Sequence, residues 1–313
     1  MEDRSFSVRR SVSATETRKT RIVCISDTHN AAPGEGYKLP KGDILIHAGD
    51  LTNQGSLSEI KKTVAWLEKA DCAVKIVVAG NHDLSLDPEY RLKYDERWKV
   101  TPQHEEECRA LLRSIPRLVY LEHSSTVVHM DGIRLQIFGS PYSPDRLTQN
   151  WAFQYTEDRA QQLWKAIPSD TDVLITHTPP SGFVDESKHW KLGGCPYLTE
   201  AIQKIKPLLH ICGHCHEGRG AQIVSWSGSE DAKYSVTEWQ DPGAGNKKQS
   251  LLDLTAGRGS YNLKAGKETA IVNASIMARS YGHGTKVFNN PIVVDLDLPV
   301  DPEAIECRLG MEE

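Results

Sequence analysis

The chain of 313 residues has a formal net charge of −5, with 39% hydrophobic and 25% charged residues. This length accommodates one large α/β domain or two smaller ones, and the composition is ordinary for a globular protein with a full core. No apolar stretch approaches the roughly 18–20 residues that a membrane helix needs, so we expect a soluble protein without a membrane partner. The acidic balance also disfavours binding to long nucleic acid, which usually requires a basic face.

Residues 1–20 are polar and rich in Arg and Ser, and we predict that they form a disordered tail. This segment lacks the apolar core of a secretory signal. The seven cysteines, an odd number, are expected to be free thiols of a cytoplasmic protein. Cys212 and Cys215 have the spacing of a zinc or redox pair, but no second pair at similar spacing accompanies them.

Short apolar runs alternate with helical patterns from Arg21 onward. Runs that are apolar at successive positions predict strands covered on both faces. We interpret in this way residues 22–25, 44–46, 76–78, 173–175 and 208–211.

The clearest helix is predicted to begin at Ser56, which forms a capping-box pattern with Glu59 and precedes apolar residues on one helical face. Residues 103–115 and 156–167 also have helical patterns.

A β-hairpin is predicted where an Asp131-Gly132 pair separates two alternating segments. Further strands are expected at 269–272 and 292–298. We therefore predict a four-layer α/β fold, with two packed mixed β-sheets flanked by α-helices, in a single domain over 21–313. Two segments without clear periodicity, near 85–102 and 226–268, are predicted to be loop insertions.

Polar side chains stand directly after the five apolar runs. Ligands bind at the carboxyl ends of strands in open α/β sheets, so five adjacent strands would gather these side chains in one small volume. The side chains are Asp27, His29, Asp50, Asn81, His177, His214 and His216. A glycine precedes Asp50, Asn81 and His214, which allows the backbone to turn tightly there.

Carboxylate, imidazole and amide groups together suit borderline divalent ions such as Mn²⁺, Fe²⁺ or Zn²⁺. Seven ligands are too many for one tetrahedral zinc, but if Asp50 bridges, each of two ions receives four protein ligands. Two such ions can clamp the attacking and leaving oxygens of an in-line phosphoryl displacement. Taken alone, Asp27 could cap a helix and Asp50 could belong to a turn. Coincidence is a poor explanation for all five motifs in order.

The remaining histidines receive structural interpretations. His47 and His210 are expected to make hydrogen bonds in the core. His104, His123 and His129 are expected at the surface or in the hairpin. His189 and His283 could approach the site from loops, although exposure to solvent is the plainer interpretation.

The sequence resembles the calcineurin-like metallophosphoesterase superfamily, and most closely its metallophosphoesterase-domain-containing (MPPED-like) phosphodiesterases. The resemblance rests on the segments CISDTHN, GDILIHAGDLTN, KIVVAGNHDLSLD, IFGSPYSP, LITHTPPSGFVD and LHICGHCHEGRGA. It covers most of residues 21–225 and, through NNPIVVDLDLP, the strand predicted near the C-terminus.

The resemblance implies two metal sites that share one carboxylate. The first metal would bind Asp27, His29, Asp50 and His216. The second metal would bind Asp50, Asn81, His177 and His214. A hydroxide between the two metals would attack phosphorus, with His82 beside the cluster as a proton donor or phosphate ligand.

Three positions depart from the wider pattern. Asn53 stands where phosphoprotein phosphatases carry an Asp that orients the catalytic His, so we expect a less strongly activated His82. Asp83 stands where near relatives more often have Glu. Arg219, just after the last ligands, could contact a substrate phosphate, although a solvated surface arginine is the plainer interpretation.

The leading hypothesis is a phosphodiesterase that acts on small phosphodiesters such as cyclic nucleotides, with two divalent ions and Mn²⁺ favoured. Its catalytic residues would be His82 and Asp50, and its substrate contacts Asn81, His82 and Arg219. The alternatives are a phosphomonoesterase or protein phosphatase, a nuclease, and a metal-binding scaffold with little turnover.

Overall fold

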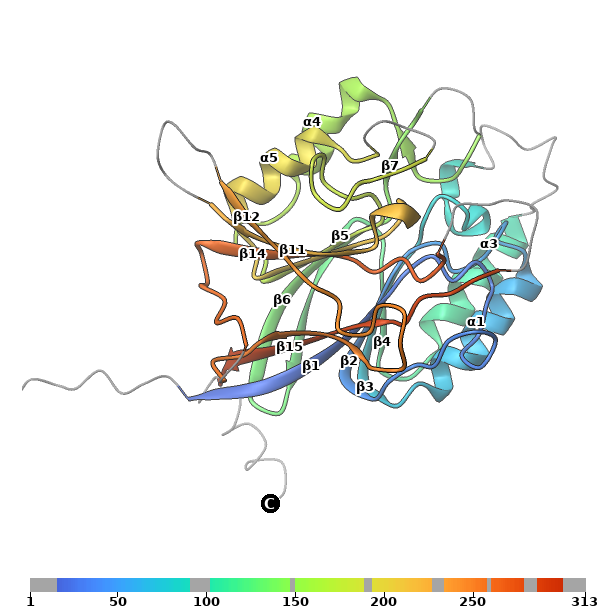
Figure 1. Cartoon of the computed structure of the whole chain (residues 1–313). Helices are drawn as coiled ribbons and strands as arrows, with labels where there is room; N and C mark the ends of the chain where they lie inside the picture. Colours follow the sequence, from blue (N-terminus) through green and yellow to red (C-terminus); the bar gives the residue numbers. More distant parts are fainter. Residues whose placement is uncertain are drawn as a thin grey trace, which may run out of the picture.

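The computed structural model describes residues 16–90, 102–146, 150–188, 193–226, 234–257, 260–278 and 286–300. Two β-sheets pack face to face at its centre, and helices cover their outer faces (Figure 1). This confirms the four-layer α/β arrangement predicted from the sequence. None of the described helices is long and apolar enough to cross a membrane.

The first sheet has six strands in the order β13-β15-β1-β2-β3-β4. Their bounds are β1 (Thr17–Ile25), β2 (Gly42–Ala48), β3 (Cys72–Val78), β4 (Leu118–Leu121), β13 (Ser250–Leu254) and β15 (Ile292–Pro299). Strands β1 to β4 run parallel to one another, and β15 joins them antiparallel to β1. The parallel strands therefore all end at the same edge of the sheet.

The second sheet has seven strands in the order β12-β11-β14-β10-β9-β6-β5. Their bounds are β5 (Ser124–Met130), β6 (Ile133–Ser140), β9 (Val173–Thr176), β10 (Leu209–Cys212), β11 (Gly220–Ser225), β12 (Ser235–Glu238) and β14 (Glu268–Asn273). Its centre is parallel, from β6 through β9 and β10 to β14. A further small sheet pairs β7 (Ser143–Pro144) with β8 (Gln154–Tyr155).

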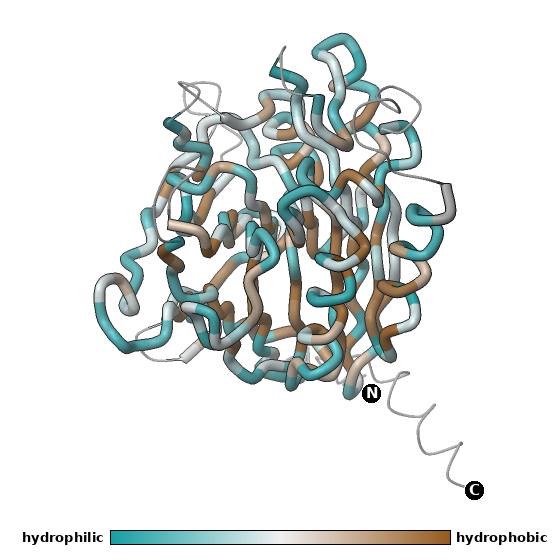
Figure 2. Tube along the Cα trace, turned by 90° about the vertical axis from the view of Figure 1, so that its right-hand side faces the viewer, coloured by the Kyte–Doolittle hydropathy of each residue, from teal (hydrophilic) through white to brown (hydrophobic). Residues whose placement is uncertain are grey.

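The main core lies between the two sheets. Ile46 and Ile76 of the first sheet and Ile137 and Ile211 of the second belong to one buried cluster. Figure 2 shows the same division, with apolar segments concentrated inside and hydrophilic loops outside. Because helices cover the outer faces as well, the central strands are buried on both sides. This explains their apolar residues at successive positions.

Helix α1 (Leu57–Lys69) begins after Ser56, and Ser56 and Glu59 form the predicted capping box. With α3 (Pro102–Arg113) it packs on the first sheet, where Val64 and Leu112 join Val77 in one cluster. Helices α4 (Glu157–Lys165) and α5 (Pro196–Ile205) pack on the second sheet. The sequence predicts α1, α3 and α4 within a few residues of these bounds, but it does not predict α5.

The predicted hairpin is present as β5 and β6. Asp131 and Gly132 join these strands with φ angles of 48° and 81°. Positive φ at both central residues is the signature of the tight primed turn.

Two predictions of irregular structure are wrong in part. The tail predicted over 1–20 overlaps β1, which begins at Thr17 and pairs with β15 from Thr17 to Cys24. Salt bridges hold polar side chains of β1 in place, since Lys19 and Arg21 both pair with the buried Asp295. The loop predicted over 226–268 contains two short strands. β12 pairs within the second sheet, and β13 pairs within the first. The insertion predicted at 85–102 lies mostly outside the described residues.

Candidate metal centre

The predicted ligands come from both sheets. Asp27 and His29 follow β1, Asp50 follows β2, and Asn81 follows β3 in the first sheet. In the second sheet His177 follows β9, and the Gly-His-Cys-His turn with His214 and His216 follows β10. The five strands are therefore not neighbours in one sheet, as the sequence interpretation assumed. Their carboxyl ends meet because the two sheets pack with these ends on the same side.

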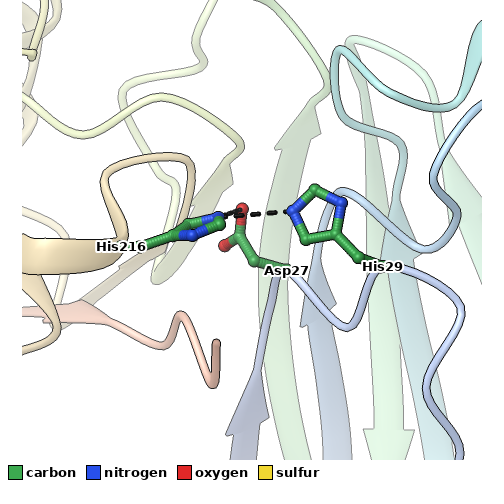
Figure 3. A group of neighbouring side chains, drawn as sticks. All are labelled: Asp27, His29 and His216. Atoms are coloured by element: carbon green, nitrogen blue, oxygen red, sulfur yellow. Dashed lines mark hydrogen bonds and ion pairs between the residues drawn. The ribbon is translucent and has the colours of Figure 1, made fainter. Parts of the chain in front are cut away.

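Asp27, His29 and His216 form the first group of donors. The His216 Nε2 atom lies 3.3 Å from Asp27 Oδ1 and 3.3 Å from His29 Nε2. Figure 3 shows the two imidazole rings approaching from opposite sides with the Asp27 carboxylate between them. The donor atoms of these three buried residues lie within 4.8 Å of one another, as the ligands of one cation would.

Asp50 links this group to a second one. Asp50 Oδ2 lies 3.6 Å from His29 Nε2, while Asp50 Oδ1 lies 3.4 Å from His177 Nε2. Asn81 Oδ1 lies 3.0 Å from the same His177 nitrogen. The rings of His177 and His214 have centroids 5.0 Å apart. One carboxylate therefore directs an oxygen to each side of the cluster.

Neighbouring backbone and side-chain groups orient these donors. The His177 Nδ1–H donates to the Ala48 carbonyl at 3.0 Å, which leaves the Nε2 lone pair pointing into the cluster. Asp27 accepts hydrogen bonds from the His214 backbone N–H and, at 2.7 Å, from the Ser275 hydroxyl. Such partners fix the direction of a ligand before any ion binds.

The backbone at these strand ends adopts conformations that side chains rarely favour. Asp27, Asp50 and His214 have φ angles of 55°, 53° and 66°. Such residues cost of order 1–3 kcal/mol each and concentrate at functional sites. Gly49 has a φ of 103°, and a Cβ atom there would collide with the His177 imidazole. A Cβ atom at Gly213 would collide with Ser26 and Asp27. These glycines allow the close approach that the sequence predicts.

The protonation states suit cation binding. Burial, followed by the neighbouring His82, lowers the pKa of His29 well below its ordinary value. Burial likewise lowers the pKa of His214, with His177 as the next cause. For Asp27 burial alone would raise the pKa, but the hydrogen bond from His216 and nearby histidine charges outweigh it and hold the pKa well below its ordinary value. Neutral imidazole and ionised carboxylate are the forms that bind metal ions.

His82 stands at the edge of the cluster and is half-buried. Its backbone N–H donates to Asp50 Oδ1 at 2.9 Å, and its Nδ1 atom lies 2.8 Å from the backbone carbonyl of Asn53. Its ring meets that of His29 edge-on at 4.7 Å and lies against Trp151 at 4.1 Å. The Asn53 side chain does not take the place of the orienting Asp, because the backbone carbonyl makes this contact.

Asp83 holds two strand ends together. Its carboxylate accepts hydrogen bonds from the backbone N–H groups of Gly80, Leu51 and Thr52 and from the Thr52 hydroxyl. Burial, followed by the nearby charge of Asp50, raises the pKa of Asp83 to about 7. This short carboxylate therefore fastens the loop after β2 to the loop after β3.

Arg219 has a structural role. Its side chain is 11% exposed, and it pairs with Asp241 at 2.9 Å. It also donates to the Ser250 hydroxyl and, at 2.7 Å, to the Asn290 carbonyl. The interpretation as a solvated surface arginine is therefore wrong. Its guanidinium group connects the Gly-His-Cys-His turn to the segment around Asp241.

The other histidines lie mostly where the sequence suggests. His47 and His210 are buried, and each bonds to a threonine hydroxyl, at 3.0 and 2.8 Å. His104 and His129 are exposed. His123 is half-buried, directly precedes the hairpin strand β5 and stacks edge-on against Phe138. His189 and His283 lie outside the described residues. The six described cysteines, all except Cys307, are free thiols.

Three residues near the cluster are not predicted from the sequence. Asn273 ends β14 and donates to the carbonyls of Val184 and Cys215, and thereby holds the turn between His214 and His216. Ser275, two residues further, bonds to Asp27. Applying the strand-end argument to the run at 269–272 would have found both. Trp151 follows no strand, and no pattern in the sequence points to it.

Comparisons with known proteins agree with this arrangement. Residues 20–218 match the family described as calcineurin-like phosphoesterase. The chain belongs to this family. The match ends at Gly218, so it includes every strand end that carries a predicted ligand.

Relatives of the chain include metallophosphoesterase domain-containing protein 1 of Homo sapiens. The two are 39% identical over 232 residues, which covers 71% of this chain and 68% of the human protein. The Mus musculus protein of the same name gives the same values. These relatives confirm the resemblance to the metallophosphoesterase-domain-containing proteins.

A further relative is a much longer fungal protein. The Emericella nidulans protein named probable rhamnogalacturonate lyase C is 41% identical over 211 residues, or 66% of this chain. The chain spans only 18% of that protein's length. The shared region is therefore a small part of the fungal protein.

Proposed function

We propose that this protein is a metal-dependent phosphodiesterase that hydrolyses small phosphodiesters such as cyclic nucleotides. The observation that carries the proposal is the convergence of donors from five strand ends. The donor atoms of Asp27, His29 and His216 lie within 4.8 Å of one another, as do those of Asp27, Asp50 and His177, and the Asn81 amide oxygen lies 3.0 Å from His177. Family membership gives the reaction class, and the chemistry of the donors suits two divalent ions.

We infer that the donors serve two ions that share Asp50. One ion would be held by Asp27, His29, Asp50 and His216. The other would be held by Asp50, Asn81, His177 and His214. When bound, the ions would lower the pKa of water to supply a nucleophile and would neutralise the phosphate charge. We propose Mn²⁺ as the preferred ion, with iron or Zn²⁺ as alternatives.

His82 is proposed to deliver a proton to the leaving oxygen. The carbonyl of Asn53 can only accept a hydrogen bond, so His82 Nδ1 carries a hydrogen and Nε2 is the nitrogen left for the substrate. Water gives up one proton to solvent as its oxygen bonds to phosphorus. As the bond from phosphorus to the leaving oxygen breaks, the leaving oxygen takes a proton from His82 Nε2–H. Asn81 is proposed to contact the substrate phosphate beside it.

The six free cysteines fit a reducing compartment, and we propose a cytoplasmic location. The net charge of −5 fits a small substrate better than a long nucleic acid.

The experiment is a substrate panel on purified protein with measured metal content. We expect Mn²⁺-dependent turnover of bis(4-nitrophenyl) phosphate and of 2′,3′-cyclic nucleotides, with 4-nitrophenyl phosphate, the matched monoester, cleaved more slowly. A faster monoester reaction would indicate a phosphomonoesterase instead. Bound metal without turnover of any ester would indicate a metal-binding scaffold, and cleavage of single- or double-stranded DNA would indicate a nuclease.

His82→Ala tests the role of the histidine within this function. On 2′,3′-cyclic nucleotides, whose leaving oxygen needs a proton, we expect a loss of about 100-fold or more in kcat with unchanged metal content, since general acid catalysis contributes about 10²–10⁴-fold. His129→Ala is the matched control, because His129 is an exposed histidine on the edge strand β5. Equal activity of the two variants would remove His82 from the proposal.

A further inference from the structure

The His82 ring is held through a loop that leads into helix α1. Its Nδ1–H group donates to the Asn53 carbonyl at 2.8 Å. The direction of that carbonyl decides where His82 Nε2 points, because a neutral imidazole bonds to a carbonyl only through the nitrogen that carries hydrogen. The position of Asn53 is therefore coupled to the position of His82.

Asn53 is fixed by the carboxylate of Glu59. Glu59 Oε1 accepts the Asn53 backbone N–H at 3.0 Å and its side-chain Nδ2–H at 2.8 Å. The other side of the amide, Asn53 Oδ1, accepts from Lys286 Nζ at 3.3 Å. Lys286 Nζ also donates to the backbone carbonyl of His29 at 2.9 Å. Hydrogen bonds through Asn53 thus connect a carboxylate of the helix to the cluster.

This contact exceeds what helix capping requires. In a capping box the third helical residue needs only to reach the backbone N–H of the N-cap residue. Glu59 does so at Ser56, with a distance of 3.1 Å, but it also makes the two shorter contacts with Asn53, six residues before it. The hydrogen bonds to Asn53 and Ser56 outweigh burial and lower the pKa of Glu59, so the carboxylate is ionised and accepts them strongly.

We propose that Glu59 is a positioning residue for His82, and that it acts by holding the Asn53 carbonyl that bonds to His82 Nδ1. The proposal rests on the proposed function, because it assigns the orientation of the proposed proton donor. It gives Asn53 a positioning role that its side chain alone does not suggest, since the main chain orients His82 and the side chain serves as its anchor.

The test compares Glu59→Gln with Ser56→Ala. Both variants remove part of the capping box, but only Glu59→Gln weakens the hold on Asn53. The substrates are bis(4-nitrophenyl) phosphate, whose leaving group needs little protonation, and diphenyl phosphate, whose leaving group needs more. For Glu59→Gln we expect kcat on diphenyl phosphate to fall about 10-fold, the lower end of the effect of losing a partner that orients a functional histidine. On the nitrophenyl ester we expect a change of less than about 2-fold, and KM should not change.

Ser56→Ala should lower Tm by about as much as Glu59→Gln does, because both variants lose part of the capping box. It should leave the ratio of the two kcat values unchanged. Asn53→Ala is the second variant, since it removes the Nδ2 contact and leaves the capping box intact. If Glu59→Gln does not fold, the Asn53→Ala variant alone tests the proposal. We expect it to change the kcat ratio in the same direction as Glu59→Gln. In a His82→Ala background, Glu59→Gln should have no further effect on the ratio.

Equal kcat ratios for the wild type, Glu59→Gln and Asn53→Ala would overturn this proposal, as would a Ser56→Ala variant that shifts the ratio as strongly as Glu59→Gln. These results differ from a failure of the proposed function. In that case the wild type would not cleave either diester, or His82→Ala would leave the kcat ratio unchanged.

Discussion

His29 Nε2 and His216 Nε2 lie 3.3 Å apart, although 187 positions separate the two residues in the chain. Two imidazole nitrogens that face each other at this distance cannot both carry hydrogen. Together with Asp27 and Asp50, these two nitrogens would supply lone pairs to a cation. This relationship carries the first prediction.

Asp50→Asn is expected to reduce metal occupancy at both sites, because Asp50 directs one oxygen to His29 and the other to His177. His216→Ala should weaken one site by at least the roughly 10–100-fold that losing a partner of a ligand costs, and leave the second ion bound. Metal analysis of the two purified variants by mass spectrometry distinguishes these outcomes. Two ions retained by Asp50→Asn would contradict its bridging position.

Gly49→Ala is expected to disrupt the cluster, since its Cβ atom would collide with the His177 imidazole at a φ of 103°. Gly34→Ala is the matched control, because Gly34 has a φ of 99° with no atom close enough to meet a Cβ. Both variants carry a backbone cost of about 1–2 kcal/mol. Only Gly49→Ala should also lose metal binding and a further 1–3 kcal/mol, roughly the cost of overpacking. Chemical unfolding and metal analysis measure the two effects, and equal results would argue against the collision.

Arg219→Met is expected to destabilise the fold by about 3 kcal/mol, because it leaves the nearly buried carboxylate of Asp241 without its cation. Removing both partners in Arg219→Met/Asp241→Leu should recover part of this loss. Lys41→Met is the surface control, since the Lys41–Asp71 pair is mostly exposed and should show no measurable change. Urea unfolding gives all three free energies. An Arg219→Met variant as stable as the Lys41→Met variant would show that the pair contributes nothing.

Asp295 is expected to make the fold sensitive to acid. Burial alone would raise its pKa, but the bonds from Arg21 and Lys19 outweigh burial and lower it. A lowered pKa in the folded state gives stability that is present above the unfolded pKa of about 3.9 and is lost as the pH falls through the lower folded value. Asp295→Asn should cost about 2 kcal/mol at neutral pH and flatten the decline below pH ~4. Urea unfolding between neutral pH and pH ~2 measures the slope, and parallel curves for the two proteins would refute this role.

Much of the fold could be predicted because local and tertiary signals agree. The central strands are covered on both sides, so their apolar residues stand at successive positions, and Asp131-Gly132 marks the hairpin without reference to the rest of the chain. Strand β13 could not be found this way. It is short, it lies in a polar segment, and it is defined by its pairing with β15. Helix α5 was also missed, because its apolar face is visible only once the second sheet is in place.

The candidate cluster was visible in the sequence because strand ends are local features. The residues that orient the cluster were less visible, since their roles depend on contacts across the fold. Asn273 acts on a turn 58 residues away, and Arg219 reaches Asp241 and Asn290. A sequence shows which groups such side chains carry, but it does not show which carbonyl or carboxylate will lie opposite.

The division of the cluster between two sheets links its assembly to the completion of folding. The β1–β3 unit carries only Asp27, His29, Asp50, Asn81 and His82, and the β9–β10 unit carries only the three remaining histidines. Neither half-site has a full set of donors until the hydrophobic faces have joined, so tight ion capture reports a correctly docked pair of sheets. By mass action, ions that bind only the joined state also oppose its separation. We therefore expect a chelator to lower the free energy of unfolding of the whole protein as well as to abolish its activity.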